Sequence, residues 1–150
     1  YGYRYRGENH LEALTRIMAQ GVEELFIKSP WSPQALLFVP PRSGTREYDR
    51  IIHLCTAISL ATGISSCQAV AARIESHQTE GFRSVDFAIH PGVAKTLVAG
   101  KEILLLDDLY RSGKTIAKLS SSLLDVAGAS SIRVLVGTQV VRNSPREATA

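Results

Sequence analysis

Apolar residues recur along the chain at two spacings, and together these predict alternating helices and strands. In the first part of the chain they return every three or four positions, which is typical of a helix buried along one face and predicts a helix over residues 10–27. Two later stretches repeat this spacing: Ile51, Leu54, Cys55 and Ile58 before Gly63, and Ile116, Leu119, Leu123 and Val126 before Gly128. Glycine commonly ends a helix, so two further helices are expected there.

Short apolar runs between these helices predict strands. They cover residues 35–39, 67–74, 85–90, 102–108 and 132–141. The run at 102–108 is continuous, as in strands buried on both faces of a parallel sheet. The polar stretch 75–84 predicts a mobile loop, and Pro91-Gly92 predicts a turn. The order of elements predicts an α/β fold with an open, mostly parallel twisted sheet flanked by helices.

Length and composition favour one globular domain over residues 1–150, ending in a polar tail at 143–150. Apolar stretches are too short to span a membrane, and no basic-then-apolar leader opens the sequence. We therefore expect a cytoplasmic protein. Cys55 and Cys67 are the two cysteines, and their spacing argues against a zinc site or a disulfide scaffold.

The net charge of +3 suits anionic ligands or nucleic acid, and an ordinary solvated surface explains it equally well. At the N-terminus, Tyr1, Tyr3 and Tyr5 alternate with Arg4 and Arg6. Such a segment can stack bases and meet phosphates, or it can dock its rings on the core as an edge segment. The second interpretation is favoured, and weak contact with nucleic acid stays the alternative.

The strand at 102–108 ends in two acids and leads into Ser-Gly-Lys-Thr. A triphosphate-binding P-loop needs a second glycine five positions before Gly113. Asp108 occupies that position, and its carboxylate would repel the phosphate. The P-loop is therefore excluded.

The two acids and the Ser-Gly-Lys-Thr turn can together bind a different kind of ligand. Amides at the start of a helix bind a phosphate monoester, and Gly113 lets the phosphate approach the backbone. Asp107 and Asp108 precede this turn at the carboxyl edge of the sheet, and carboxylates accept hydrogen bonds from sugar hydroxyls or from hydrated Mg²⁺. A ribose 5-phosphate satisfies both halves.

The stretch from Ile103 to Thr115, ILLLDDLYRSGKT, resembles the signature of type I phosphoribosyltransferases, which bind 5-phosphoribosyl-1-pyrophosphate (PRPP). The resemblance implies that Asp107 and Asp108 hold the ribose hydroxyls and Mg²⁺, the latter directly or through water or the hydroxyls. The 5′-phosphate would be held by Arg111, Ser112, Gly113, Lys114 and Thr115. Tyr110 and Arg111 depart from the pattern, which has an aliphatic and a small residue there.

Residues 3–25 and 42–54 are similar to the competence protein F (ComF) family, whose members carry an arginine-rich loop ending near Arg-Gly-Phe-Asn-Gln. The corresponding residues here are Arg46, Glu47, Tyr48, Asp49 and Arg50. Arg73 and Gln78 also match an arginine and a glutamine of that family. The cysteine-rich zinc module that often precedes the domain is missing, so the chain resembles an isolated domain of a longer protein.

A second anion loop follows the first strand, and arginine suits phosphate oxygens through its planar fork. We expect the pyrophosphate of PRPP to bind Arg42, Ser43, Gly44, Arg46 and Arg73. His77 and Gln78 lie in the expected mobile loop, which would close over the site. An exposed basic loop is the competing interpretation.

The sequence thus predicts a Mg²⁺-dependent phosphoribosyltransferase with an unidentified acceptor. Enzymes of this type recognise their base with a separate hood, and no segment large enough is evident. The alternative is therefore a non-catalytic module that binds PRPP or another ribose 5-phosphate nucleotide and serves regulation or DNA metabolism. A homodimer is a further expectation.

Overall fold

The computed structural model describes residues 8–42, 44–77, 83–110 and 113–139. Predictions that fall on the remaining residues lie outside this description. No helix within the described ranges is both long and apolar enough to cross a membrane.

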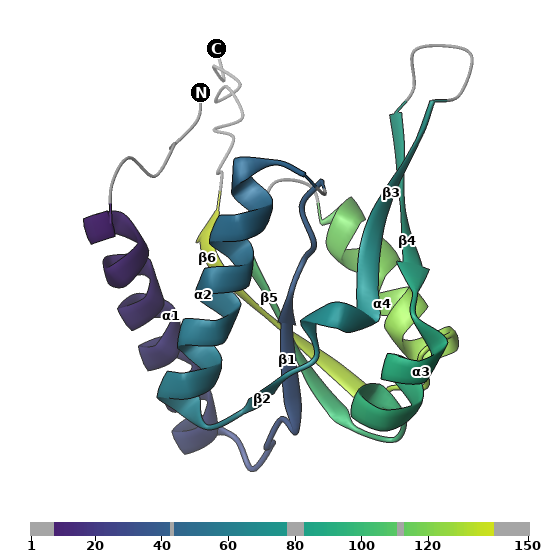
Figure 1. Cartoon of the computed structure of the whole chain (residues 1–150). Coiled ribbons are helices and arrows are strands. Elements are labelled where there is room, and N and C mark those ends of the chain that lie inside the picture. The colour runs from purple at the N-terminus through teal and green to yellow at the C-terminus, as the bar shows by residue number, and fades with distance from the viewer. Residues whose placement is uncertain (1–7, 43, 78–82, 111–112, 140–150) are drawn as a thin grey trace, which may run out of the picture.

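A parallel sheet of four strands forms the centre of the fold (Figure 1). Its order is β2 (Ser65–Ser66), β1 (Ala35–Phe38), β5 (Glu102–Tyr110) and β6 (Ser131–Gln139), and each neighbouring pair is parallel. The four residues 103–106 of β5 are completely buried, because β5 has strands on both sides and helices over both faces. The sheet confirms the predicted α/β class.

Helices cover the two faces of the sheet with separate cores. On one face, α1 (Glu8–Lys28) and α2 (Arg46–Thr62) pack on Leu104 and Leu106; we call this the α1–α2 core. On the other face, α4 (Lys114–Asp125) packs on Ile103 and Leu105; this is the α4 core. Odd and even residues of β5 thus serve different cores, as the alternation of side chains in a strand requires.

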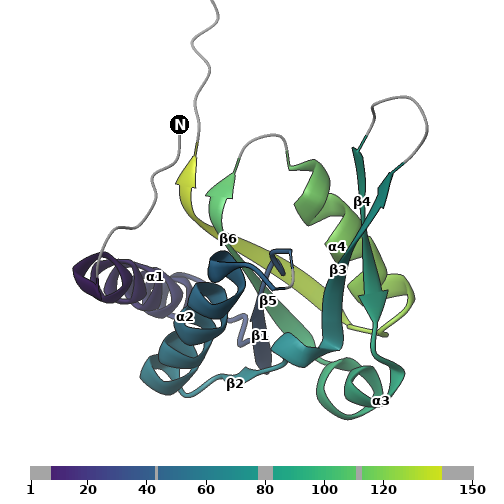
Figure 2. The same cartoon turned by 45° about the horizontal axis from the view of Figure 1, so that its top comes forward.

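The second sheet is an antiparallel hairpin of β3 (Ala71–His77) and β4 (Arg83–Ile89), packed beside α4 (Figure 2). It corrects two predictions. The predicted strand 67–74 begins as a 3₁₀ turn over Gln68–Val70 and continues as β3, outside the parallel sheet. The predicted loop 75–84 is strand as far as His77 and again from Arg83, because the two arms pair with each other.

Two smaller predictions were also wrong. Pro91-Gly92 begins α3 (Pro91–Val93), which continues as a π-helix over Ala94–Val98, because proline fits the first turn of a helix. Val126, expected on the apolar face of α4, is 69% exposed, because the helix ends at Asp125 and Val126 lies beyond its regular turns.

Candidate functional site

The carboxyl ends of β1 and β5 form the point where the topology of the sheet reverses. β1 and β5 are neighbours, yet the chain leaves β1 into α2 on one face and leaves β5 into α4 on the opposite face. In open α/β sheets, ligands bind in the crevice that such a reversal creates. Arg42 and Gly44 follow β1 in the chain and Gly113 follows β5, so the described residues of both predicted anion sites come directly after these carboxyl ends.

The loop between β1 and α2 is a tight turn closed by Thr45. The Thr45 hydroxyl donates to the Arg42 carbonyl at 2.7 Å and accepts from the Tyr48 amide at 3.3 Å. Gly44 has a φ of +76°, a left-handed conformation that favours glycine. Arg42 and Gly44 are exposed, whereas Ser43 lies outside the described residues.

The first turns of α2 carry the cationic and aromatic residues of the predicted motif on different flanks. Residues four apart share a flank of a helix, so Arg46 lies with Arg50 and Tyr48 lies with Ile52. The structure therefore separates Arg46 from Tyr48, although both belong to the same stretch of sequence.

The predicted phosphate cradle between β5 and α4 is described from Gly113 onward. Gly113 is the N-cap of α4 with a φ of +74°, so this cap has no side chain to accept from the first amides of the helix. No acidic residue occurs in the first turn. Lys114 is exposed and Thr115 is half-buried, and Arg111 and Ser112 lie outside the description.

Asp107 and Asp108 are both half-buried near the carboxyl end of β5. The strand does not end with them, because β5 stays paired with β6 as far as Tyr110. Strand alternation therefore places Asp107 on the face of the α4 core and Asp108 on the face of the α1–α2 core. From the sequence we expected the two acids to act side by side as a pair. In the structure they lie on opposite faces of the sheet.

Arg73 and Asp107 both lie on the side of the fold that carries the α4 core. It follows Ala71 by two positions along β3, and Ala71 packs in the α4 core. Arg73 is half-buried there. His77 is the last residue of β3, its side chain lies outside the description, and Gln78 lies outside it altogether.

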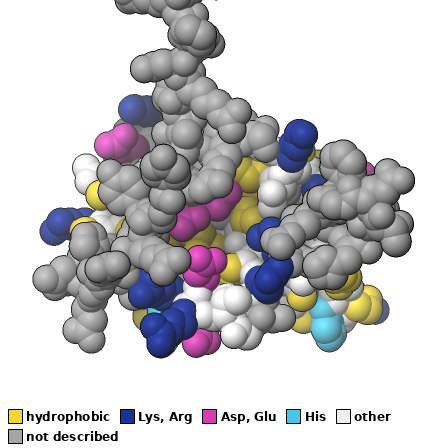
Figure 3. Space-filling view, turned by 90° about the horizontal axis from the view of Figure 1, so that it is seen from above, with side chains coloured by type: hydrophobic (Ala, Val, Ile, Leu, Met, Phe, Trp, Pro, Cys, Tyr) yellow, Lys and Arg dark blue, Asp and Glu magenta, His cyan; other side chains and the backbone are white. Residues whose placement is uncertain are grey.

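Figure 3 views the molecule from above the carboxyl edge of the sheet, with acidic side chains in the middle and basic side chains on either side. This distribution suits a ligand that offers hydroxyls or a cation to the acids and phosphates to the flanks. Within the described ranges, no group of three or more His, Cys, Asp or Glu residues could hold a metal. Two carboxylates still fit Mg²⁺, which takes one or two of them together with phosphate oxygens of the substrate.

The cysteines are unsuited to nucleophilic chemistry. Both are buried, and burial raises the pKa of each thiol, for Cys67 to about 12 with a further contribution from the charge of Cys55. Protonated thiols are poor nucleophiles.

Sequence reasoning missed Gln68. Its side-chain amide bonds the backbone of Phe38 on both sides: the oxygen accepts from the Phe38 amide at 2.7 Å, and the nitrogen donates to the Phe38 carbonyl at 3.0 Å. Gln68 thus supports the end of β1 below the loop of Arg42. Its only signal in the sequence was a polar residue inside an apolar run.

No family model and no curated protein matches the sequence. Solved structures do match. A purine phosphoribosyltransferase from Pyrococcus horikoshii OT3 has 16% identity and a TM-score of 0.54, over 90% of this chain and 79% of that chain. Adenine phosphoribosyltransferase from Saccharomyces cerevisiae, complexed with adenine and an imino-altritol bisphosphate, has 12% identity and a TM-score of 0.56, over 91% and 73%.

A third structure is a hypothetical protein from Neisseria gonorrhoeae with bound ppGpp, at 14% identity and a TM-score of 0.55 over 93% of this chain and 81% of that chain. At these identities the likeness shows the fold, which is that of type I phosphoribosyltransferases. The resemblance to the ComF family stays a prediction from sequence.

Proposed function

We propose that the chain binds PRPP with Mg²⁺ in the crevice between β1 and β5 and transfers ribose 5-phosphate to an acceptor. The observation that carries the proposal is the reversal of topology between these strands, because the chain leaves β1 and β5 on opposite faces of the sheet, and ligands of open α/β sheets bind at such a point. The likeness in fold to two phosphoribosyltransferases supports it.

The turn after β5 would bind the 5′-phosphate. Gly113 leaves the first amides of α4 accessible to the anion, and Lys114 adds a positive charge. Arg111, Ser112 and Thr115 complete the proposed cradle. A phosphate here would leave the ribose beside the last residues of β5. β1 pairs with β5 only as far as Leu106, so Asp107 and Asp108 lie beyond the end of β1, one toward each face of the sheet, and would accept hydrogen bonds from the ribose hydroxyls from these two sides.

The pyrophosphate would extend toward β1. Arg42, Ser43 and Gly44 would hold it from the loop, Arg46 from α2, and Arg73 from the side of the hairpin. When bound, Mg²⁺ neutralises charge on the leaving pyrophosphate. The chain itself would contribute positioning and electrostatic stabilisation, because the bond at C1′ of the ribose breaks early and develops positive charge on the sugar.

The alternative is a module that binds PRPP or a nucleotide without transferring it. The described residues supply the sheet, its flanking helices and the hairpin, and none of them forms a further layer that could select an acceptor base. The solved structure with bound ppGpp supports nucleotide binding as a role for such a fold.

Calorimetry with PRPP and Mg²⁺ tests the site. We expect Asp107→Asn and Asp108→Asn each to weaken binding roughly 10- to 100-fold, because each removes a charged hydrogen-bond acceptor. The double variant should abolish binding. Asp125→Asn, an exposed acid at the far end of α4, is the matched control. Unchanged affinity in the double variant would refute the site.

Transfer is tested by following pyrophosphate release from PRPP with Mg²⁺ and a panel of bases. Turnover that depends on a base supports the transferase. Tight binding of PRPP without turnover on any base supports the non-catalytic module.

A further inference from the structure

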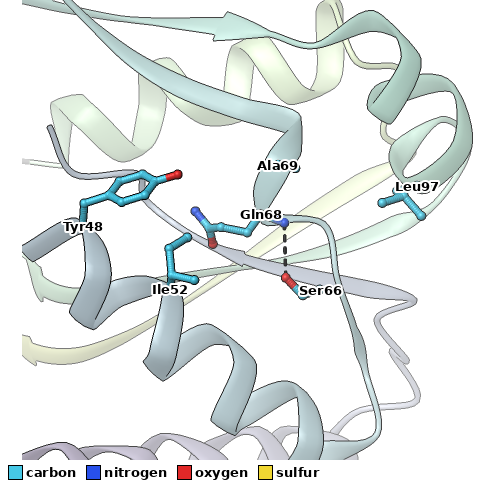
Figure 4. Close-up of a pocket in the computed structure, with 6 residues that line it drawn as sticks. All are labelled: Tyr48, Ile52, Ser66, Gln68, Ala69 and Leu97. Atoms are coloured by element: carbon cyan, nitrogen blue, oxygen red, sulfur yellow. Dashed lines mark hydrogen bonds between the residues drawn. The ribbon is translucent and has the colours of Figure 1, made fainter. Parts of the chain in front are cut away.

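A hollow of about 290 Å³ lies on the side of β1 that faces away from β5 (Figure 4). It opens between the first turns of α2 and the segment that leads from β2 into β3, with the π-helix across from them. Its lining residues are Tyr48, Ile52, Ser66, Gln68, Ala69 and Leu97. In the strand order, β1 lies between this edge of the sheet and β5, whose acids belong to the proposed PRPP site.

The hollow exists because β2 is too short to cover the edge of β1. β2 pairs only with Ala35 and Leu36, and at Cys67 the chain turns away from the sheet. Farther along the edge, the amide of Gln68 takes the place of a paired strand by bonding both backbone groups of Phe38. The space that a longer strand would fill stays open beside this amide.

Gln68 gives the hollow a polar group of fixed orientation. A carboxamide has two N–H donors and two acceptor lone pairs. Phe38 uses one N–H and one lone pair, so one of each is left for a ligand. The two bonds to the backbone hold the amide in place before any ligand arrives, which lowers the entropic cost of binding.

The other walls are largely apolar. Tyr48 is 38% exposed and Leu97 is 36% exposed, and in Figure 4 the Tyr48 ring lies toward the Gln68 amide while Leu97 stands across the hollow. Leu97 is presented by a π-helical turn, a feature often found at functional sites. None of the lining residues is charged. A charged group would lose its hydration here without gaining a partner.

We propose that this hollow binds a neutral, flat heterocycle that carries a hydrogen-bond donor and an acceptor on its edge, the chemistry of a nucleobase. The ring would stack on Tyr48 and bond the remaining groups of the Gln68 amide. The volume of about 290 Å³ lies just below the usual range for ligand pockets, about 300–1,000 Å³, so the site takes one ring system rather than a whole dinucleotide. The proposal goes beyond PRPP binding and does not depend on it.

Ligand-observed NMR and calorimetry with adenine, hypoxanthine, uracil and cytosine test the proposal, and cyclohexanecarboxamide serves as a non-planar control. We expect at least one base to bind, with affinity weakened about tenfold in Tyr48→Ala because an aromatic stacking partner is lost. Leu97→Ala should weaken the same base independently. Leu60→Ala, on the outer surface of α2 and 81% exposed, is the matched control and should leave affinity unchanged.

The double variant Asp107→Asn/Asp108→Asn separates this proposal from the first. It should keep full affinity for the base, because the acids lie beyond β1. The proposal is overturned if no base binds the wild-type chain, if Tyr48→Ala and Leu97→Ala both bind as well as wild type, or if the double acid variant loses the base. If the wild-type chain binds a base but not PRPP, only the proposed PRPP site is refuted.

Discussion

The amide of Gln68 replaces a paired strand at the edge of β1, so its removal should destabilise the fold measurably. Gln68→Ala leaves the backbone N–H and C=O of Phe38 without their partner. A hydrogen bond of this kind contributes about 0.5–1.5 kcal/mol net, so two of them give roughly 1–3 kcal/mol. For a chain of this size, each kcal/mol shifts Tm by about 2–4 °C.

Urea unfolding followed by circular dichroism measures the effect, and two variants isolate its cause. Gln68→Met keeps most of the side-chain volume without the amide and should be destabilised nearly as much as Gln68→Ala. Gln34→Ala removes one exposed bond, to the Glu102 amide at 3.1 Å, and should cost at most about 1 kcal/mol. The reasoning is refuted if Gln68→Met is as stable as wild type, because packing alone would then explain the role of Gln68.

Two further predictions concern the cradle and the core. Gly113→Ala forces a Cβ into a left-handed conformation, so it should lower stability by about 1–2 kcal/mol in thermal melts, and an unchanged Tm would contradict the positive φ. Stability should fall from pH 9 toward pH 12, because unfolded Cys67 ionises near its ordinary pKa of 9.0 while burial raises its pKa in the fold to about 12. Cys67→Ala should lose less stability over that range than wild type does, and equal losses would rule out this contribution.

The elements that could be predicted from sequence are those whose burial follows from local pattern. The helices α1, α2 and α4 show their apolar stripes at helical spacing, and β5 shows an unbroken apolar run. β3 was placed in the wrong sheet, because an apolar run does not say which strand it pairs with. In the structure β3 pairs with β4 instead, in an antiparallel register that extends from Ala71–Ile89 to His77–Arg83.

For the candidate site, the order of residues alone showed two acids after the buried run of β5 and a glycine before α4, and the binding of an anion at that glycine stays a prediction. The faces on which the acids lie were decided by tertiary pairing, since β5 continues along β6 past both of them. Gln68 was beyond prediction for a similar reason, because the backbone that it bonds is thirty residues away in the chain. The sequence alone determines which side chains lie close together along the chain. The face of the sheet on which a side chain lies, and the strand or backbone group that it pairs with, depend on contacts that form only when distant segments pack together.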